Sequence, residues 1–189
     1  MSRSRALRQG IDRGLEWLVQ WDIETMHAVS SHPALRRLGP AFVAATFLGD
    51  GYLWGALALG LILFGSPTDR SHVLIALGIT VVNVSLFQLF KLLFTRPRPT
   101  AGPLALLSRL SDSYSFPSGH TTIAFGVAWT VAVLYPRMAY QLATFFGAVT
   151  ISVSRVYLRE HYPFDVIGGA LLGSVTALYL LPVFMRLLL

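Results

Sequence analysis

The chain of 189 residues has no cysteine and only one lysine, Lys91, beside fourteen arginines. Without cysteine, a disulfide scaffold, thiol catalysis and cysteine-based metal sites are excluded. Carboxylates are also few, because Asp and Glu together number nine. No cluster of acidic residues that could hold Mg²⁺ is visible in the sequence. We therefore expect neither a metal nor any other cofactor.

Charge of either sign is scarce and unevenly placed. Charged residues make up 13% of the chain, against roughly 25% in soluble domains. Ten of the 24 charged residues precede position 39, which leaves 14 for the last 151 residues. Hydrophobic residues reach 54% and the mean hydropathy is +0.60. This composition excludes a disordered or collagen-like chain and predicts an all-α integral membrane helical bundle.

Five apolar segments are long enough to cross a bilayer, which takes about 20 residues in a helix. We predict transmembrane helices over residues 43–65, 72–94, 119–136, 138–157 and 164–186. Residues 95–118 form the only long polar connection and carry four prolines. A connection of that length in a compact protein favours a functional segment.

The first 38 residues differ from the rest in their pattern. Leu7, Ile11, Leu15 and Leu18 form an apolar stripe at helical spacing, next to a charged stripe. This pattern predicts an amphipathic helix lying in the membrane interface. We thus divide the chain into an N-terminal interfacial region, 1–38, and a transmembrane bundle, 39–189, that carries the motif residues within 91–165. The alternative is that the N-terminal helix itself spans the membrane.

The net charge of +6 indicates an anionic partner. The arginines flank apolar segments and form no polar basic run, so we expect anionic headgroups or an anionic lipid substrate rather than nucleic acid. The oligomeric state cannot be derived from the sequence.

Alternation of the five spans puts most polar residues of the bundle at one membrane face. The N-terminus, residues 95–118 and residues 158–163 share this face, whereas the links near Pro67 and Pro136 lie at the other. The residues gathered in this way come from three separate stretches: Lys91, Arg96, Arg98, Ser118, Gly119, His120, Arg155, Arg159, His161 and Asp165.

These residue types suit phosphate chemistry. Fixed cations and the N–H groups at a helix start bind a phosphate. One imidazole can attack phosphorus while another protonates the leaving oxygen, and a carboxylate can hold the tautomer of the attacking ring. The pattern indicates phosphoryl transfer through a phosphohistidine without a metal ion.

The same residues resemble a known family. Residues 91–99, KLLFTRPRP, resemble the Lys-x6-Arg-Pro signature of the type 2 phosphatidic acid phosphatase superfamily. Residues 117–120, PSGH, and the run from Ser154 to Asp165 are similar to its second and third motifs, in order and spacing. The resemblance covers about residues 83–189. Vanadium haloperoxidases and glucose-6-phosphatase share these motifs, so vanadate should fit the site.

The resemblance implies a role for each motif residue. His161 would be the nucleophile and Asp165 the group that orients it, while His120 would be the acid for the leaving group and then the base for water. The residues that would hold the phosphoryl oxygens are Lys91, Arg98, Ser118, Gly119 and Arg155. Membrane phosphatases of this family commonly have six spans, whereas this sequence predicts five and an interfacial helix.

Other polar and small residues are expected to have ordinary structural roles. We interpret Arg96 as a charge at the pocket rim or facing lipid, and Arg159 and Glu160 as solvated loop charges. Asp50, between two glycines, is interpreted as a helix cap. The remaining residues are expected to be surface or interfacial groups (His27, His32 and His72), packing or anchoring residues (Trp54 and Trp129) and sites of close helix packing (Gly168, Gly169 and Gly173).

The sequence thus predicts a multi-pass phosphatase of the plasma or inner membrane that acts on a lipid phosphomonoester or diphosphate. Polyprenyl diphosphate, phosphatidate and phosphatidylglycerol phosphate all fit. The alternatives are a phosphatase for a prenyl-linked phosphosugar and a non-enzymatic membrane protein that binds or carries phospholipids. Six arginines precede the first span and three lie at the opposite face, so the positive-inside rule predicts a cytoplasm-facing site.

Overall fold

The computed structural model describes residues 3–99 and 114–189, and nearly all of these residues are helical. In chain order the helices are α1 (Arg3–Ser31), α2 (Pro33–Arg36), α3 (Gly39–Gly49), α4 (Tyr52–Phe64), α5 (Pro67–Phe94), α7 (Gly119–Leu134), α8 (Met138–Tyr157) and α9 (Pro163–Leu188). An isolated antiparallel bridge joins Pro97 to Tyr114. The predicted all-α fold class is confirmed.

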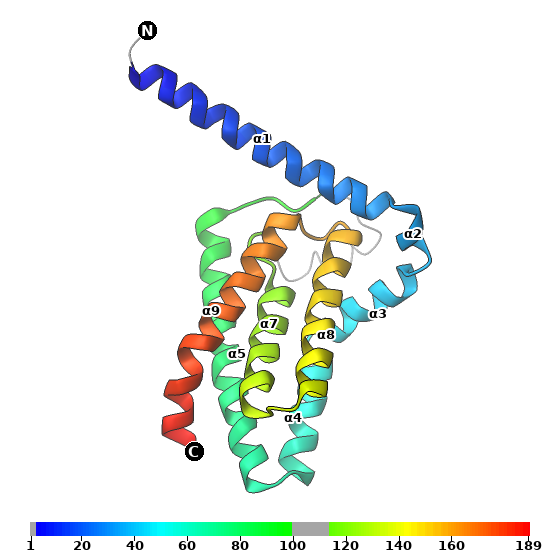
Figure 1. Cartoon of the computed structure of the whole chain (residues 1–189), viewed down its shortest axis with the longest axis vertical. Coiled ribbons are helices and arrows are strands. Elements are labelled where there is room, and N and C mark those ends of the chain that lie inside the picture. Colours follow the sequence, from blue (N-terminus) through cyan, green and yellow to red (C-terminus); the bar gives the residue numbers. More distant parts are fainter. Residues whose placement is uncertain (1–2, 100–113) are drawn as a thin grey trace.

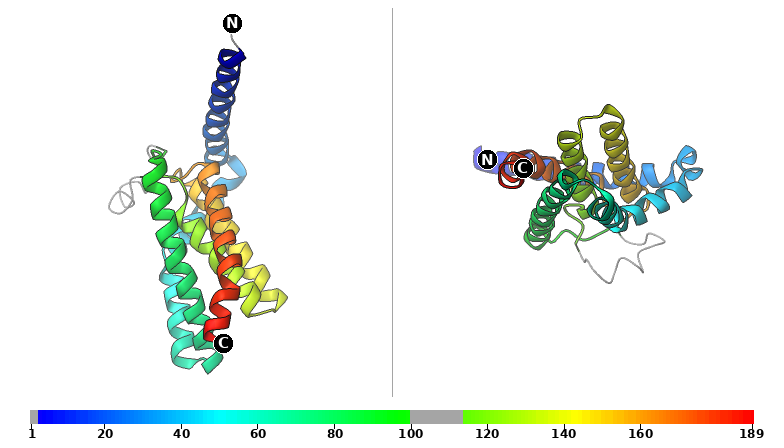
Figure 2. Two further views of the ribbon diagram at one scale, coloured as in Figure 1. Left: turned by 90° about the vertical axis from the view of Figure 1, so that its left-hand side faces the viewer. Right: turned by 90° about the horizontal axis from the view of Figure 1, so that it is seen from below.

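The helices α4, α5, α7, α8 and α9 form an elongated bundle, and α1 crosses one end of it obliquely (Figure 1). Helix α7 is central and contacts α5, α8 and α9. The links α4–α5 and α7–α8 lie at the end far from α1, whereas the α8–α9 link lies beneath α1 (Figures 1 and 2). The predicted sharing of one end by the N-terminal region and residues 158–163 is therefore confirmed.

Local sequence explains where the long helices begin and end. The Ser66 hydroxyl accepts a hydrogen bond from the backbone N–H of Asp69, whose carboxylate accepts from the N–H of Ser66, so a capping box starts α5. Thr95, with a positive φ of 44°, ends α5 before Pro97. Pro163 starts α9 and puts Asp165 in its first turn, as expected.

Four of the five predicted spans correspond to single helices, and the first does not. Residues 43–65 are divided between α3 and α4, which together are apolar enough to span but are bent by 53° at Asp50 and Gly51. Gly51 has a φ of 98°, a conformation that ends α3 and that only glycine adopts readily. The prediction of one continuous helix over residues 43–65 was wrong, because the hydropathy of the sequence does not show where the chain changes direction.

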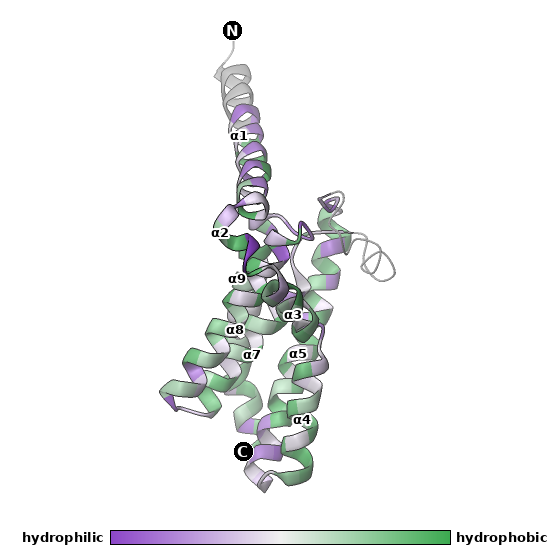
Figure 3. Cartoon of the chain, turned by 90° about the vertical axis from the view of Figure 1, so that its right-hand side faces the viewer, coloured by the Kyte–Doolittle hydropathy of each residue, from purple (hydrophilic) through white to green (hydrophobic). Residues whose placement is uncertain are grey.

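Among the described residues, α5 and α9 are each long and apolar enough to cross a membrane, and the bent pair α3–α4 would add a third crossing; α7 is apolar but shorter, with 16 residues. Large apolar side chains remain exposed around the bundle, including Leu57, Leu63, Leu92, Phe146 and Leu171. Figure 3 shows apolar residues along the whole bundle and a more polar α1. Such a continuous apolar exterior is the surface that a bilayer covers.

Glycines bring α7 and α9 into close contact. A Cβ atom added at Gly173 would lie 2.1 Å from the carbonyl oxygen of Thr122, and one at Gly169 would lie 2.6 Å from that of Ser118. A Cβ atom at Gly168 would meet the ring of Phe116. The predicted role of these glycines in close packing is confirmed. Their effect is to fix the start of α9 against the start of α7, where the motif residues lie.

The predicted helix of the N-terminal region is present as α1, and one of its residues enters the bundle. Asp22 is fully buried, and Met26 is 3% exposed. Leu15, Trp17 and Val19 on the same helix are exposed. The carboxylate of Asp22 accepts a hydrogen bond from the backbone N–H of Phe164 at 2.9 Å. Helix α1 is thereby joined to the first turn of α9.

Candidate active site

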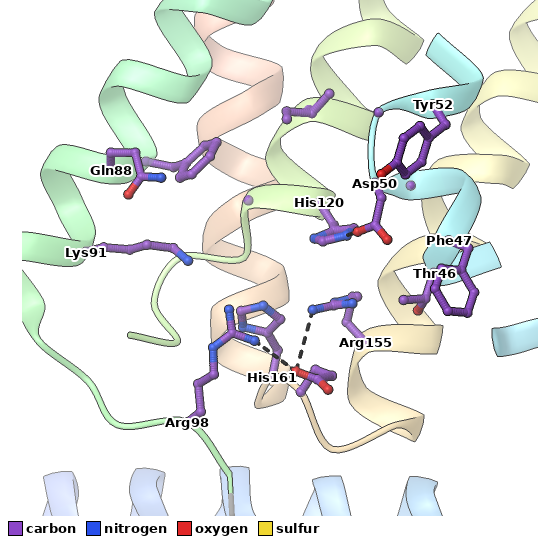
Figure 4. A pocket seen from close by; sticks show the side chains of 16 residues that line it. Thr46, Phe47, Asp50, Tyr52, Gln88, Lys91, Arg98, His120, Arg155 and His161 are labelled. Carbon is purple, nitrogen blue, oxygen red and sulfur yellow. Dashed lines mark hydrogen bonds and ion pairs between the residues drawn. The ribbon is translucent and has the colours of Figure 1, made fainter. Parts of the chain in front are cut away.

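A pocket of about 470 Å³ lies at the α1 end of the bundle and contains six of the eight predicted site residues. It is lined by the predicted residues Lys91, Arg98, Gly119, His120, Arg155 and His161, and by Asp50 and Glu160 among others. These side chains come from α5, α7, α8, the α3–α4 break and the segments that follow α5 and α8, and they face a common space (Figure 4). The other two predicted residues, Ser118 and Asp165, are fully buried and do not line it.

Backbone contacts hold the three motif segments together. The N–H of Ser115 donates to the carbonyl of Arg96 at 2.8 Å, and the N–H of Ser118 donates to the carbonyl of Asp165 at 2.9 Å. Lys91, in the last turn of α5, donates through Nζ to the carbonyl of Tyr114. These bonds bring motifs that are far apart in sequence to one place.

Three cations and one carboxylate form the polar wall of the pocket. Arg98 donates to Glu160 at 2.9 Å, and Arg155 forms an ion pair with the same carboxylate at 3.7 Å (Figure 4). Burial lowers the pKa of Arg98, and the charge of Glu160 acts in the opposite direction; the guanidinium stays protonated. Glu160 is 4% exposed, so our interpretation of it as a solvated loop charge was wrong. It orients both guanidinium groups.

His161 is almost fully buried, at 1% exposure, beside these cations. Burial, reinforced by the charges of Arg155 and Arg98, holds its pKa well below the usual value. The ring is therefore neutral at neutral pH, with a nitrogen lone pair available for reaction. Its Nδ1 lies 3.5 Å from Oδ2 of Asp165 and has no hydrogen-bond partner within the described residues.

Arg96 has a different role from the one predicted. It donates to Asp165 at 2.7 Å and to Asp22 at 2.6 Å, and its guanidinium lies 4.1 Å from the ring centre of Tyr162. Burial lowers its pKa, but the two carboxylates outweigh this effect and raise it. Arg96 is thus an internal bridge from α1 to Asp165 and neither a rim charge nor a lipid-facing one. Asp22 lies 74 residues before Arg96 in the sequence, so no local sequence pattern indicates this contact.

Both carboxylate oxygens of Asp165 accept hydrogen bonds from groups other than His161. Its Oδ1 accepts from Arg96, and its Oδ2 accepts from the backbone N–H of Tyr162 at 2.8 Å. These bonds fix the carboxylate beside His161, whose Nδ1 lies 3.5 Å from Oδ2. Ser118 does not face the pocket, because its hydroxyl accepts a bond from Thr121 at 3.1 Å. Gly119 starts α7 and offers helix-start N–H groups at the pocket wall.

His120 has a partner that the sequence did not predict. Its Nε2 is bonded to Oδ1 of Asp50, which lies at the break between α3 and α4 (Figure 4). Asp50 follows the last residue of α3 as expected of a cap, but its side chain bonds His120. The glycines on both sides of Asp50 were the available signal, since they allow a close approach.

The remaining histidines and tryptophans match the expected structural roles. His27 and His32 are exposed, and His72 packs edge-on against Tyr135. Trp54 and Trp129 pack against the two apolar clusters of the bundle. Arg159 donates to the hydroxyl of Ser30 at 2.9 Å, so it helps to attach the end of α1.

Comparison with known protein families gives a match over residues 72–188 to the PAP2 superfamily. This range includes the pocket-lining residues from α5 onward but not those of α3, the α3–α4 break and the start of α4. The chain belongs to the PAP2 superfamily. The predicted family is thereby confirmed.

Relatives of known name are similar in sequence to this PAP2 protein. An undecaprenyl-diphosphatase of Sulfolobus acidocaldarius is 33% identical over 67% of this chain and 61% of its own length. A lipid A 4'-phosphatase of Bacteroides thetaiotaomicron is 32% identical over 54% of this chain and 48% of its own length. Alignment with the probable lipid phosphate phosphatase beta of Arabidopsis thaliana covers 85% of this chain and 87% of that one, at 28% identity. The first two matches span less than two thirds of those relatives.

Two solved structures share the fold. The LpxE structure from Aquifex aeolicus superimposes with a TM-score of 0.62 and 27% identity, over 85% of this chain and 94% of that one. A PAP2-type phosphatidylglycerolphosphate phosphatase from Bacillus subtilis gives a TM-score of 0.70 at 23% identity, over 89% of this chain and 87% of that one. The second likeness concerns the fold alone. Together with the apolar helices, these relations make the chain a multi-pass membrane protein.

Proposed function

We propose that this PAP2 protein is a lipid phosphatase that removes phosphate from a lipid phosphomonoester or diphosphate through a phosphohistidine intermediate. The observation that carries the proposal is the meeting of His120 and His161 with Lys91, Arg98 and Arg155 in one pocket. A phosphate carrier needs the cations, but it needs neither histidine, so the pair of imidazoles favours an enzyme over a binding protein.

The phosphoryl group is held by charge. Lys91, Arg98 and Arg155 provide three cations and Gly119 provides the start of α7, which suits the oxygens of a phosphate. Nε of Arg155 is buried and has no hydrogen-bond partner in the described residues, so a phosphate oxygen would satisfy it. In this proposal the cations neutralise the developing charge, and the reaction proceeds without a metal ion.

His161 attacks first. Its Nδ1 faces Asp165, so Nε2 is the atom that forms the bond to phosphorus. The bond from phosphorus to the lipid-side oxygen breaks, its electron pair stays on that oxygen, and His120 supplies the proton. His120 then takes a proton from water, the water oxygen attacks the phosphohistidine, and inorganic phosphate leaves while His161 is regenerated.

Asp165 supports the ring of His161. The distance of 3.5 Å between Nδ1 of His161 and Oδ2 of Asp165 shortens to that of a hydrogen bond when Nδ1 carries the proton and positive charge develops on the ring. The bonds from Arg96 and Tyr162 keep the carboxylate in place during this change. Asp165 thus orients the nucleophile and stabilises its charged form.

The substrate is proposed to be a lipid whose phosphate enters the pocket while its tail stays in the bilayer. The names of the relatives, undecaprenyl-diphosphatase and lipid A 4'-phosphatase, favour a polyprenyl diphosphate or a phosphorylated glycolipid as the substrate class. The connection 95–118 was expected to be functional, and its residues 100–113 lie outside the described residues.

The test is phosphate release by purified protein in detergent or vesicles. The panel contains undecaprenyl diphosphate, phosphatidate, phosphatidylglycerol phosphate and a prenyl-linked phosphosugar. We expect turnover of at least one, no turnover by the His161→Ala variant, no effect of EDTA and inhibition by vanadate. Binding of these lipids without any phosphate release would instead identify a carrier. A Mg²⁺ requirement would contradict the metal-free mechanism.

A further inference from the structure

The break between α3 and α4 places a carboxylate against the second histidine of the pocket. Oδ1 of Asp50 is bonded to Nε2 of His120. Asp50 lies outside the part of the chain that matches the PAP2 family, residues 72–188. The bond therefore joins the motif histidine to an element that the family match does not include.

The local sequence allows this approach. A Cβ atom added at Gly49 would lie 3.1 Å from Cδ2 of His120 and 3.1 Å from Cγ2 of Ile151, so a larger residue there would push the break away from the ring. Gly51 has a φ of 98°, which lets the chain turn directly after Asp50. Gly49 and Gly51 thus allow the carboxylate of Asp50 to lie against the imidazole of His120.

We propose that Asp50 is a positioning residue for His120, bonding its Nε2 so that Nδ1 presents a proton to the leaving oxygen of the substrate. This inference rests on the proposed phosphatase function. The two nitrogens of an imidazole lie on opposite sides of Cε1, so a partner at one leaves the other for the substrate. A carboxylate at Nε2 also stabilises the protonated ring.

The charges around His120 explain why a carboxylate is needed. The guanidinium groups of Arg155, from α8, and Arg98, from the segment after α5, line the same pocket as His120, so a positive charge on its ring would face these cations. His161 also lines the pocket. Asp50 supplies the negative charge that opposes these cations, while leaving them available to phosphate.

In the first chemical step, His161 Nε2 bonds to phosphorus and the P–O bond to the leaving group breaks. The leaving oxygen takes the electron pair and the proton from His120 Nδ1, and Asp50 remains ionised throughout. Loss of Asp50 should therefore matter most when the leaving oxygen is strongly basic, and little when it leaves readily without a proton.

The experiment compares two lipid-like substrates that differ in the leaving group. They are 4-dodecylphenyl phosphate and its 2-nitro derivative, whose phenolate leaves without protonation. For Asp50→Asn we expect kcat/KM to fall at least about tenfold on the first ester and less than about threefold on the second, as for partial loss of a general acid. The Asp50→Glu variant should recover part of the loss. The ratio kcat/KM is used because it reports steps up to release of the phenol.

Two controls separate positioning from structural damage. Asp69→Asn, which removes a hydrogen-bonded carboxylate near the opposite end of the bundle, should leave the wild-type ratio of the two kcat/KM values. In a His120→Ala background, only the 2-nitro ester should still release its phenol, and Asp50→Asn should have no further effect on kcat/KM for that ester. An equal loss on both esters in Asp50→Asn overturns the inference. Wild-type protein that hydrolyses neither ester nor any lipid phosphate overturns the proposed function itself.

Discussion

Asp165, His120 and His161 have different roles in the proposed reaction, so replacing each of them should reduce turnover by a different factor. We expect His161→Ala and His120→Ala to abolish turnover, because each removes an atom that makes a bond or moves a proton. Asp165→Asn removes only orientation and charge support, so it should retain weak activity, roughly 10²–10⁴-fold below wild type. The measurement is kcat for lipid phosphate hydrolysis, with trapping of the phosphorylated protein. Full activity in His161→Ala would contradict the covalent mechanism.

The buried neutral state of His161 predicts a pH dependence of stability. Its pKa is well below the usual value in the folded protein because of burial and the nearby guanidinium charges. The unfolded chain titrates near pH 6.5, so below that pH the unfolded state binds a proton that the folded state does not. Stability is then lost as the pH falls, by up to about 1.4 kcal/mol per pH unit from this group.

This dependence is measured as the Tm of wild type and of His161→Gln in detergent at pH 7.5 and pH 5.5. The variant lacks the titrating ring, so its Tm should fall less between the two pH values. His27→Gln, which replaces an exposed histidine outside the pocket, serves as the control and should keep the wild-type loss of Tm. Identical losses of Tm in wild type and His161→Gln would show that this histidine does not contribute.

At the scale of the helix, α1 should contribute to both stability and catalysis through Asp22. The Asp22→Ala variant leaves the N–H of Phe164 and one side of Arg96 without their partner, at a cost of about 1–3 kcal/mol. Turnover should also fall, because Arg96 is then free to move Asp165. Glu24→Ala is the matched control, since Glu24 is an exposed acidic residue on the same helix. The measurements are the Tm and the kcat of both variants. Equal changes in Asp22→Ala and Glu24→Ala would show that α1 does not support the site through Asp22.

Close packing of α7 and α9 gives a second prediction for elements. In Gly173→Ala the new methyl group would lie 2.1 Å from the carbonyl oxygen of Thr122, so the helices must separate, which costs about 1–3 kcal/mol. Gly147→Ala on α8 meets nothing within 4 Å and should be neutral or stabilising by up to about 1 kcal/mol. The Tm of the two variants measures the difference. A stable Gly173→Ala variant would show that the contact can relax.

The helices were largely predictable, because span length and apolar runs are local properties. Residues 138–157 were predicted as a span and form a helix with the same ends, and Pro163 was correctly expected to start the last helix. The break at Gly51 was missed, since hydropathy is the same on both sides of it. The motif residues could be found by spacing. The supporting residues Asp22, Arg96 and Glu160 could not be found in this way, because each acts through a contact between distant segments. Asp50 had only its two flanking glycines as a signal.

The whole molecule has one polar end, and its orientation in the membrane remains a prediction from charge. Six arginines precede the first predicted span, namely Arg3, Arg5, Arg8, Arg13, Arg36 and Arg37, and three lie at the other face, namely Arg70, Arg137 and Arg186. The loops near the site also recruit arginines for an anionic substrate, but these six belong to a different segment of the sequence. The positive-inside rule therefore predicts a site that faces the cytoplasm.

Because the chain has no cysteine, single cysteines test this orientation directly. Ser31→Cys places a thiol at the exposed end of α1, on the pocket side, and Thr68→Cys places one at the exposed start of α5, at the opposite end. An impermeant thiol reagent applied to intact cells should label Thr68→Cys and spare Ser31→Cys, and both should be labelled after lysis. Labelling of Ser31→Cys alone in intact cells would place the pocket outside, where the six N-terminal arginines would then lie against the positive-inside rule.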